Sequence, residues 1–233
     1  MSQSTLPIEL PKQLIRLPAD QLLDQFGAGG HSPGSGSAAA LMGLLSAQLI
    51  ATVCKISKAG DGQSVQEFEF VLGRIETRVI PELKALFQRD AEDFDRVIRA
   101  RVQRDNETDP AAKRRYREQA LRLLEESTDI IFTISRQCLS LVDYALIVFD
   151  GGSKKVRGDS GAAISAAIAG AMSGLFIINL NLRSFQSGRW AIGRKREAEN
   201  LHAEIIRKQE DAFTRIVTLQ PEEVSEIQPS LFD

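Results

Sequence analysis

The sequence has little of what marks secreted, metal-binding or all-β proteins. It contains two cysteines in 233 residues, Cys54 and Cys138, and both lie in apolar stretches. Two isolated thiols cannot build a disulfide framework, and no Cys/His pattern has the spacing of a metal site. Alternating runs rich in Val, Ile and Thr, which indicate strands, are also absent. We therefore expect buried free thiols, no bound metal and an all-α fold.

A strong net charge is lacking too. The formal net charge is -2, from 29 basic and 31 acidic residues. Such a balance creates no field that would draw the whole molecule to nucleic acid or to a membrane surface, so direct nucleic-acid binding is not expected. The segment from Met1 to Arg16 has no apolar core of the signal-peptide type. These features together predict a cytoplasmic protein.

What recurs along most of the chain is helical periodicity. Apolar spacing, caps and Gly or Pro breakers predict helices over residues 20–26, 35–57, 64–104, 110–149, 159–185 and 190–219. Pro81 should kink or break the third of these. No compositional break divides the chain, so residues 1–218 are expected to form one domain, a single helical bundle. Residues 219–233 contain two prolines, four acidic residues and no basic one, which predicts a disordered acidic tail.

Charge is missing altogether from two long segments. None of the 23 residues between His31 and Lys55 is charged, and the same is true of the 23 between Asp159 and Arg183. A segment of this length can span a membrane. Many Gly, Ala and Ser residues, together with Gln48, favour instead the centre of a soluble bundle. The fold prediction is thus a bundle around two central uncharged helices, outside any membrane.

Small residues recur every four positions in both segments. Such ridges lie on one face of a helix and let two backbones approach closely. We expect the two helices to pack tightly, against each other or against a partner subunit, and a homodimer is favoured. The ridges are formed by Ala39, Gly43, Ala47 and Ala51 in the first segment, and by Ala162, Ala166, Gly170 and Gly174 in the second.

Each uncharged segment begins with residues that suit a ligand site. Pro33 to Ser37 combines proline, glycines and serines, so that backbone can approach a ligand and Ser35 or Ser37 can cap the helix. The amide groups and the positive dipole end there suit a carboxylate or carbonyl oxygen. Asp159 opens the second segment, where it is either an N-cap or a carboxylate facing a site at which the two helix starts meet.

These residues carry a resemblance to a known family. Pro33-Gly34-Ser35-Gly36-Ser37-Ala38, with Val53 to Ser57 at the end of the same helix, resembles the opening of the formimidoyltetrahydrofolate cyclodeaminase and methenyltetrahydrofolate cyclohydrolase family. Asp90 to Phe94, Gly158 to Ala163 and Ile178-Asn179-Leu180 resemble later elements, in the family's order. Ser35 stands where the family has the middle glycine of a triplet, and Gly151-Gly152 stands where it usually has Gly-Asn.

The resemblance implies an enzyme that acts on a one-carbon derivative of tetrahydrofolate, without a cofactor or a metal. In the cyclodeaminase reaction N10 attacks the formimino carbon and ammonia leaves, whereas in the cyclohydrolase reaction water attacks the methenyl carbon. Both reactions pass through a delocalised cation and move a proton, so both need a carboxylate. Asp159 is the first candidate. Asp90 is the second, with a solvated charge as its alternative. The expected substrate-binding residues are Pro33, Gly34, Ser35, Gly36, Ser37, Asn179 and Lys55.

Cations are expected to hold the glutamate end of the folate. Lys55 is one candidate, and the run containing Arg189, Arg194, Lys195 and Arg196 is another, although such a run also fits a solvated helix face. Two alternatives to an enzyme stay open. The chain could bind folate without catalysis, or it could be a helical interaction module that kept the fold.

The tail carries one further motif. Gln228-Pro229-Ser230-Leu231-Phe232 resembles the short peptide by which bacterial proteins dock on the replication sliding clamp. Leu231 and Phe232 would fill an apolar pocket, with Gln228 at its rim. Pro229 replaces the usual leucine and removes a backbone donor. The alternative is an end whose Leu-Phe pair packs locally or not at all.

Overall fold

The structure is a computed structural model, and it describes residues 13–57 and 62–219. Within these ranges the chain is helical and contains no strand, which confirms the predicted all-α class. Of the predicted tail at 219–233, only Leu219 is described, and the Gln228–Phe232 motif lies outside the described residues. The helices are α1 (Ala19–Gly27), α2 (Ser35–Ser57), α3 (Gly62–Arg74), α4 (Ile80–Asn106), α5 (Pro110–Gly151), α6 (Arg157–Leu182) and α7 (Arg189–Val217).

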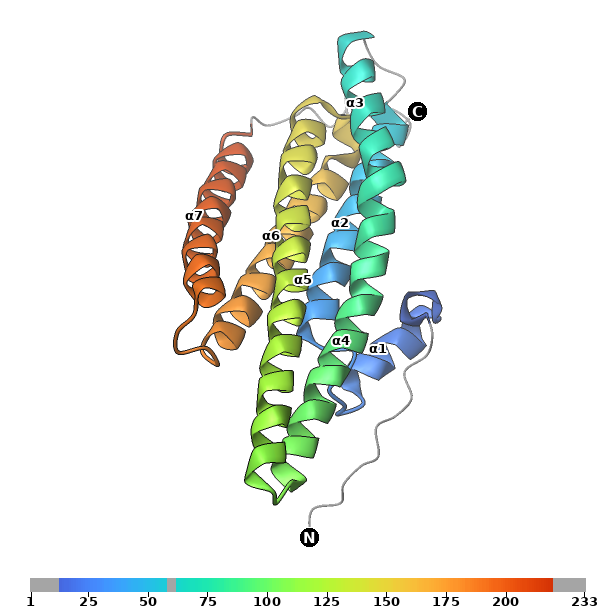
Figure 1. Cartoon of the computed structure of the whole chain (residues 1–233). Helices are drawn as coiled ribbons and strands as arrows, with labels where there is room; N and C mark the ends of the chain where they lie inside the picture. The colour runs from blue at the N-terminus through green and yellow to red at the C-terminus, as the bar shows by residue number, and fades with distance from the viewer. Residues whose placement is uncertain (1–12, 58–61, 220–233) are drawn as a thin grey trace.

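The long helices run along one common axis (Figure 1). α4 and α5 form an antiparallel hairpin that extends below the first turn of α2 in this view, while α1 crosses near that level. α2 packs against α4, α5 and α6 at once, so it is the central helix of the bundle. Its inward positions are filled by small or branched apolar residues such as Ala39, Ala47 and Ile50, all fully buried. The uncharged composition of α2 follows from this position.

The two uncharged helices pack against each other in opposite directions. Near the start of α2, the carbonyl oxygen of Ala39 lies 3.0 Å from where a Cβ on Gly170 would stand, in the second half of α6. Near the end of α2, the Ser57 hydroxyl accepts a hydrogen bond of 2.8 Å from the backbone amide of Ser153, just before α6. The predicted close packing of the two helices is therefore confirmed at Ala39 and Gly170, and α2 and α6 are antiparallel. The two ridges do not meet along their whole length, since Ala162 is exposed and Gly174 lies against Ser135 and Ile131 of α5.

The break expected at Pro81 takes the form of a π-helical turn. Residues Ile75–Val79 are π-helical, and Pro81 follows in the first turn of α4. Proline cannot donate a backbone hydrogen bond, and a wider turn accommodates the missing bond without breaking the helix. The backbone angles at Arg74 and Ile80 remain helical, so α3 and α4 continue one another. α5 begins as expected, with the Asp109 carboxylate accepting from the amide of Ala112 at 2.7 Å.

Both cysteines are buried, as expected, and neither forms a disulfide bond. Burial raises the pKa of the Cys138 thiol to about 12, because the charged thiolate is poorly solvated among apolar side chains. Cys138 lies between the two ridges, where its sulfur would be 2.8 Å from a Cβ on Gly170 and 3.0 Å from one on Gly43. The two thiols fill space in the core.

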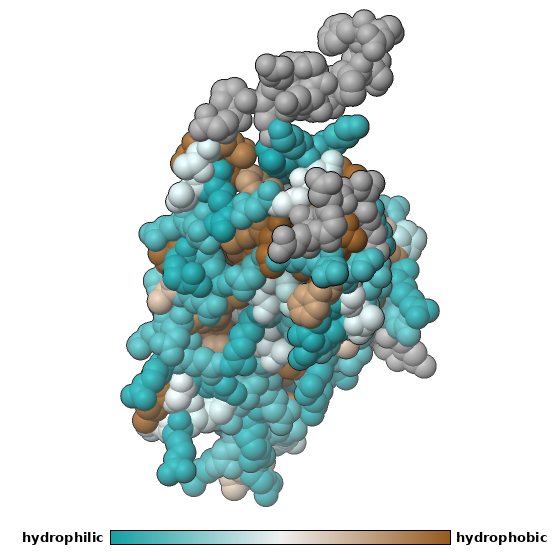
Figure 2. Space-filling view, turned by 90° about the horizontal axis from the view of Figure 1, so that it is seen from above, coloured by the Kyte–Doolittle hydropathy of each residue, from teal (hydrophilic) through white to brown (hydrophobic). Residues whose placement is uncertain are grey.

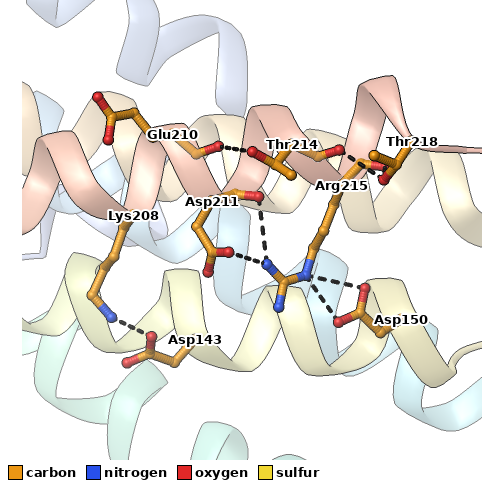
Figure 3. A network of polar contacts seen from close by, with 8 residues as sticks. All are labelled: Asp143, Asp150, Lys208, Glu210, Asp211, Thr214, Arg215 and Thr218. Atoms are coloured by element: carbon orange, nitrogen blue, oxygen red, sulfur yellow. Dashed lines mark hydrogen bonds and ion pairs between the residues drawn. The ribbon is translucent and has the colours of Figure 1, made fainter.

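α7 docks on the outside of α5 through polar contacts (Figure 3). Lys208, which is 3% exposed, forms an ion pair with Asp143 of α5. Two turns further on, the Arg215 guanidinium reaches Asp150 of α5 at 2.9 Å and also pairs with Asp211 on its own helix. Each lost pair would leave a charge partly desolvated, so these contacts fix the register of α7 on α5.

Three helices are long and apolar enough to cross a membrane, judged by length and composition alone: Ser35–Ser57, Pro110–Gly151 and Lys154–Leu182. Much of each is buried inside the bundle. Viewed from above, hydrophilic side chains make up most of the visible surface, with smaller hydrophobic patches between them (Figure 2).

Candidate functional site

The first turn of α2 packs on a buried carboxyl group of α4. Asp90 is 4% exposed, and its Oδ2 accepts a hydrogen bond of 2.8 Å from the hydroxyl of Ser37. Gly36 lies directly against this carboxylate, because a Cβ at that position would overlap Asp90 Oδ1 and the side chain of Ile131. A side chain at Gly36 would therefore displace the Asp90 carboxylate and the tip of Ile131, and three predicted site residues meet at one point.

The loop before α2 is tied to the same stretch of α4. The Ser32 hydroxyl donates to the carbonyl oxygen of Ala91 at 3.0 Å. The carbonyl oxygen of Gly34 accepts the first helical hydrogen bond, from Ala38 at 3.0 Å. Ser37 was expected as one of two capping residues, but its side chain turns to Asp90 of α4, with the Phe87 carbonyl 3.3 Å away. A carboxylate from another helix thus lies at this helix start, where the dipole of α2 favours negative charge.

Burial dominates the protonation of Asp90. Loss of solvent raises the pKa of its carboxyl from 3.8 to about 6, while hydrogen bonds from the hydroxyl and backbone amide of Ser37 lower it and the nearby Asp93 raises it slightly. Asp93 is itself held between Arg89 at 3.3 Å and Arg96 at 3.0 Å. The alternative of a solvated charge at Asp90 is therefore wrong.

This arrangement can both take up and release a proton near neutral pH. A general acid or base works best when its pKa is near the working pH, and a buried carboxylate also stabilises an adjacent cation more strongly than an exposed one. In the loop above the carboxyl, Gly34 is half-buried and Ser35 is exposed. Pro33 is buried beneath it. Of the predicted residues, Pro33, Gly34, Ser35, Gly36, Ser37 and Asp90 lie together.

Asp159 and Lys55 lie at the other end of the α2–α6 pair. Because the helices are antiparallel, the start of α6 is beside the last turns of α2, and Lys55 is about 30 Å from Ser35 along the pair. The expectation that the two helix starts meet is wrong within one chain. Asp159 is half-buried in the first turn of α6, which begins at Arg157, so it is not the N-cap either. Lys55 is exposed and forms an ion pair of 2.7 Å with Glu76. A catalytic role for Asp159 stays a prediction.

Asn179 lies in the last turns of α6, towards the end of the bundle that holds the start of α2. Its side chain is exposed and donates to the carbonyl oxygen of Leu175 at 2.9 Å. Arg194, one of the cations considered for the glutamate end, pairs instead with Asp129 at 2.9 Å and lies over the ring of Phe132. Among residues 13–57 and 62–219, no three His, Cys, Asp or Glu side chains are grouped as metal ligands would be.

Sequence reasoning missed two features near this site. One is Ile131 of α5, which shares with Asp90 the contact to Gly36. The other is a basic groove between the lower halves of α4 and α5, lined in part by Arg101, Arg104 and Arg117. Spacing gave a usable signal for the groove, since positions 90, 97, 101 and 104 fall on one face of a helix.

Comparisons with known proteins find relatives of this sequence and of this fold. The family model described as formiminotransferase-cyclodeaminase matches residues 18–200. A methenyltetrahydrofolate cyclohydrolase of Methylorubrum extorquens is 29% identical over 189 residues, which cover 79% of this chain and 88% of that protein. The solved structure of a formiminotetrahydrofolate cyclodeaminase from Thermotoga maritima has a similar fold, with a TM-score of 0.73 at 18% identity, over 88% of this chain and 99% of the other.

Proposed function

Because the chain belongs to the formiminotransferase-cyclodeaminase family, we propose that it is an enzyme acting on a one-carbon derivative of tetrahydrofolate, as a methenyltetrahydrofolate cyclohydrolase or a formiminotetrahydrofolate cyclodeaminase. The observation that carries the proposal is the Asp90 carboxyl, buried, bonded to Ser37 and lying against the first turn of α2. The family names the substrate class. The site supplies the group that the chemistry needs.

In the cyclohydrolase reaction, water adds to the cationic methenyl carbon and loses a proton, after which the bond from that carbon to N5 breaks and N5 takes up a proton. The ionised Asp90 carboxylate accepts that proton and stabilises the cation before attack. The Gly34–Gly36 backbone lies against the ligand, since these positions carry little or no side chain. Ser37 positions the carboxylate through its hydrogen bond. This reaction is the first to assay, because the relative of higher identity is a cyclohydrolase.

In the cyclodeaminase reaction, N10 attacks the formimino carbon and ammonia leaves. The leaving nitrogen needs a proton, so the same carboxyl acts in its protonated form. A pKa of about 6 leaves both forms of Asp90 populated just below neutral pH. One buried carboxyl therefore supports either reaction, with opposite pH dependence.

We further propose that the active form is a cytoplasmic homodimer that joins the outer faces of α2 and α6. These faces carry exposed apolar side chains, with Leu45 at 57%, Phe176 at 68% and Leu180 at 61% exposure. No charged residue occurs in residues 32–54 or 160–182, so neither helix adds a charge to these faces. An apolar face of this kind fits a second copy of itself, because a twofold interface joins identical patches.

The proposed activity is tested by two assays on the purified protein. The first follows loss of the methenyl chromophore of 5,10-methenyltetrahydrofolate, and the second follows its appearance from 5-formiminotetrahydrofolate. We expect the protein to accelerate at least one of them well above the rate in buffer. Binding of a reduced folate without acceleration of either reaction would favour the non-catalytic alternative.

A further inference from the structure

The end of the α4–α5 hairpin carries a strong excess of positive charge. Residues 96–122 contain nine Lys or Arg and four Asp or Glu, whereas the whole chain has a net charge of -2. This end extends below the first turn of α2 in Figure 1. A local excess of positive charge at a protruding end indicates a surface for an acidic partner.

Two adjoining grooves lie in this end. The first has a volume of about 420 Å³, and its lining includes three arginines and an apolar floor, formed by Arg101, Arg104 and Arg117 with Ala120, Leu121 and Leu124. The second has a volume of about 510 Å³, shares Arg104 and Arg117, and adds Pro110, Lys113 and Arg114. We call the two together the arginine groove. Cations around an apolar floor suit an acidic peptide that also carries apolar side chains.

Most of this charge is not neutralised. Of the five basic residues that line the groove, only Arg104 forms an ion pair with another described residue, Asp105, at 2.8 Å. The pKa of Asp105 is lowered, first by its hydrogen bond with Arg104 and also by the charges of Lys113 and Arg101. One carboxylate thus faces several cations, so the groove can accept further negative charge.

The chain itself contains a segment of matching chemistry. Residues 219–233 include Glu222, Glu223, Glu226 and Asp233 and no basic residue, and Leu231-Phe232 stands directly before the last of these carboxylates. Four acidic side chains complement the unpaired cations, and the Leu-Phe pair complements the apolar floor. The distance of these residues from Leu219 along the chain limits where they can bind.

The segment is too short to fill the groove of its own chain. Arg215, near the end of α7, contacts Asp150 of α5 at 2.9 Å. Leu121, in the groove, precedes Asp150 by 29 residues, which is about 44 Å along the helix. Phe232 follows Leu219 by thirteen residues, a reach of about 45 Å, so it would arrive only fully stretched. The glutamates follow Leu219 by at most seven residues and stay about 20 Å short.

We propose that residues 222–233 of one copy bind in the arginine groove of a second copy, with the Leu-Phe pair on the apolar floor and the carboxylates on the cations. A guanidinium group holds a carboxylate through two parallel hydrogen bonds, so several arginines suit a segment with several carboxylates. A twofold axis perpendicular to the bundle turns the second copy end for end and places the end of its α7 level with the hairpin of the first. Each copy then fills the groove of the other, and the assembly closes at two copies. This interaction does not depend on the folate activity.

Photo-crosslinking of the full chain tests where the segment binds. Phe232 is replaced by the photoreactive benzoylphenylalanine, and products are separated by mass, because a cross-link between copies doubles the mass of the chain. We expect products of doubled mass that join position 232 to residues 101–124. Products within one copy only, products outside the hairpin, or no product would overturn the inference.

Dissociation of the dimer, measured by sedimentation at several concentrations, tests the residues. Arg101→Gln/Arg117→Gln and Phe232→Ala should each raise the dissociation constant on the order of tenfold. All three changes combined should raise it no further, because they remove the two sides of one contact. The control Arg115→Gln/Arg122→Gln removes two exposed charges from the same helix, at positions that line neither groove, and should leave the constant unchanged.

If Arg101→Gln/Arg117→Gln melts early, Phe232→Ala decides alone, because it changes no described residue. An unchanged dissociation constant in Phe232→Ala, or additive losses in the combined variant, would contradict the proposed contact. Binding of single-stranded RNA that is lost in Arg101→Gln/Arg117→Gln would also contradict it, since the groove would then serve nucleic acid. Added salt should weaken the wild-type dimer more than the Arg101→Gln/Arg117→Gln dimer, because salt screens pairs of exposed charges.

Discussion

At the scale of single residues, Asp90 costs the protein stability. Its carboxyl has a pKa of about 6 in the folded chain, against 3.8 when solvated. The folded state therefore binds the proton more tightly than the unfolded state does. The stability that comes from this tighter binding is fully present below pH 3.8 and is lost as pH rises through 6. This difference between the two pKa values lowers the free energy of unfolding by roughly 3 kcal/mol at pH 8, relative to its value at low pH.

The Asp90→Asn variant should therefore be more stable than the wild-type protein above pH 6, by up to roughly 3 kcal/mol, and the difference should shrink towards pH 4. Denaturant unfolding at several pH values measures this. The matched control is Asp95→Asn, whose carboxylate pairs with Arg99 on the surface of the same helix. A destabilised Asp90→Asn protein at pH 8 would show that Asp90 is a structural anion.

The pH dependence of turnover separates the two proposed reactions. With Asp90 as general base, cyclohydrolase kcat/KM should rise with pH through about 6, and with Asp90 as general acid, cyclodeaminase kcat/KM should fall through the same value. Ser37→Ala removes the hydroxyl bond that lowers the Asp90 pKa, so it should move the midpoint upward. A midpoint that does not respond to Ser37→Ala would assign the titration to another group.

At the scale of elements, the α2–α6 contact depends on the absence of a side chain at Gly170. A Cβ there would stand 2.8 Å from the Cys138 sulfur and 3.0 Å from the Ala39 carbonyl oxygen, whereas one at Gly161 of the same helix would meet nothing within 4 Å. We predict that Gly170→Ala destabilises the protein by about 1–3 kcal/mol and that Gly161→Ala stabilises it by up to about 1 kcal/mol. Thermal unfolding of the two variants, each compared with the wild-type protein, measures both effects. Equal melting temperatures would mean that α6 shifts freely against α2.

The sequence could predict the elements but not their directions. Apolar periodicity and the Asp109-Pro110 start placed the long helices within a few residues of those observed. The ridges around Gly43 and Gly170 indicated close packing. Small residues at four-residue spacing allow parallel and antiparallel packing equally, so the sequence could not predict the antiparallel pairing that separates Asp159 from Ser35. Pro81 predicted an interruption, but whether a kink or a π turn results depends on the packing of Ile75 and Val79 in the core.

Only part of the site could be predicted from the sequence, again because the arrangement of the helices was unknown. Asp90, Gly36 and Ser37 each stood out by type and by resemblance, but their meeting depends on how α4 is rotated about its axis. From the sequence alone, a carboxylate such as Asp90 that stands among Arg89, Glu92 and Asp93 fits a solvated helix face as well as it fits a buried site. Only the packing of α2 on α4 shows that Asp90, and none of these three neighbours, points inward to Ser37. Arg101 lies on the same face of α4.

At the scale of the whole molecule, the uncharged outer face of α2 and α6 should hold two copies together. Phe176→Asp places a charge on this face and should yield a monomer, or a dimer weakened at least about tenfold. Phe70→Asp is the matched control, because Phe70 is similarly exposed, at 64%, but lies on α3 outside the face. Mass in solution by light scattering measures both. A wild-type monomer at micromolar concentration would contradict the dimer, and partition of the protein into vesicles would favour a membrane as the occupant of the face.

The most direct test of the central claim is the rate at which the Asp90→Asn variant removes the methenyl chromophore, compared with the wild-type protein at the same pH. If Asp90 transfers the proton in folate turnover, the wild-type protein accelerates the reaction over buffer and the variant loses about a hundredfold or more of that rate while its melting temperature does not fall. A variant that turns over 5,10-methenyltetrahydrofolate as fast as the wild-type protein would contradict the claim.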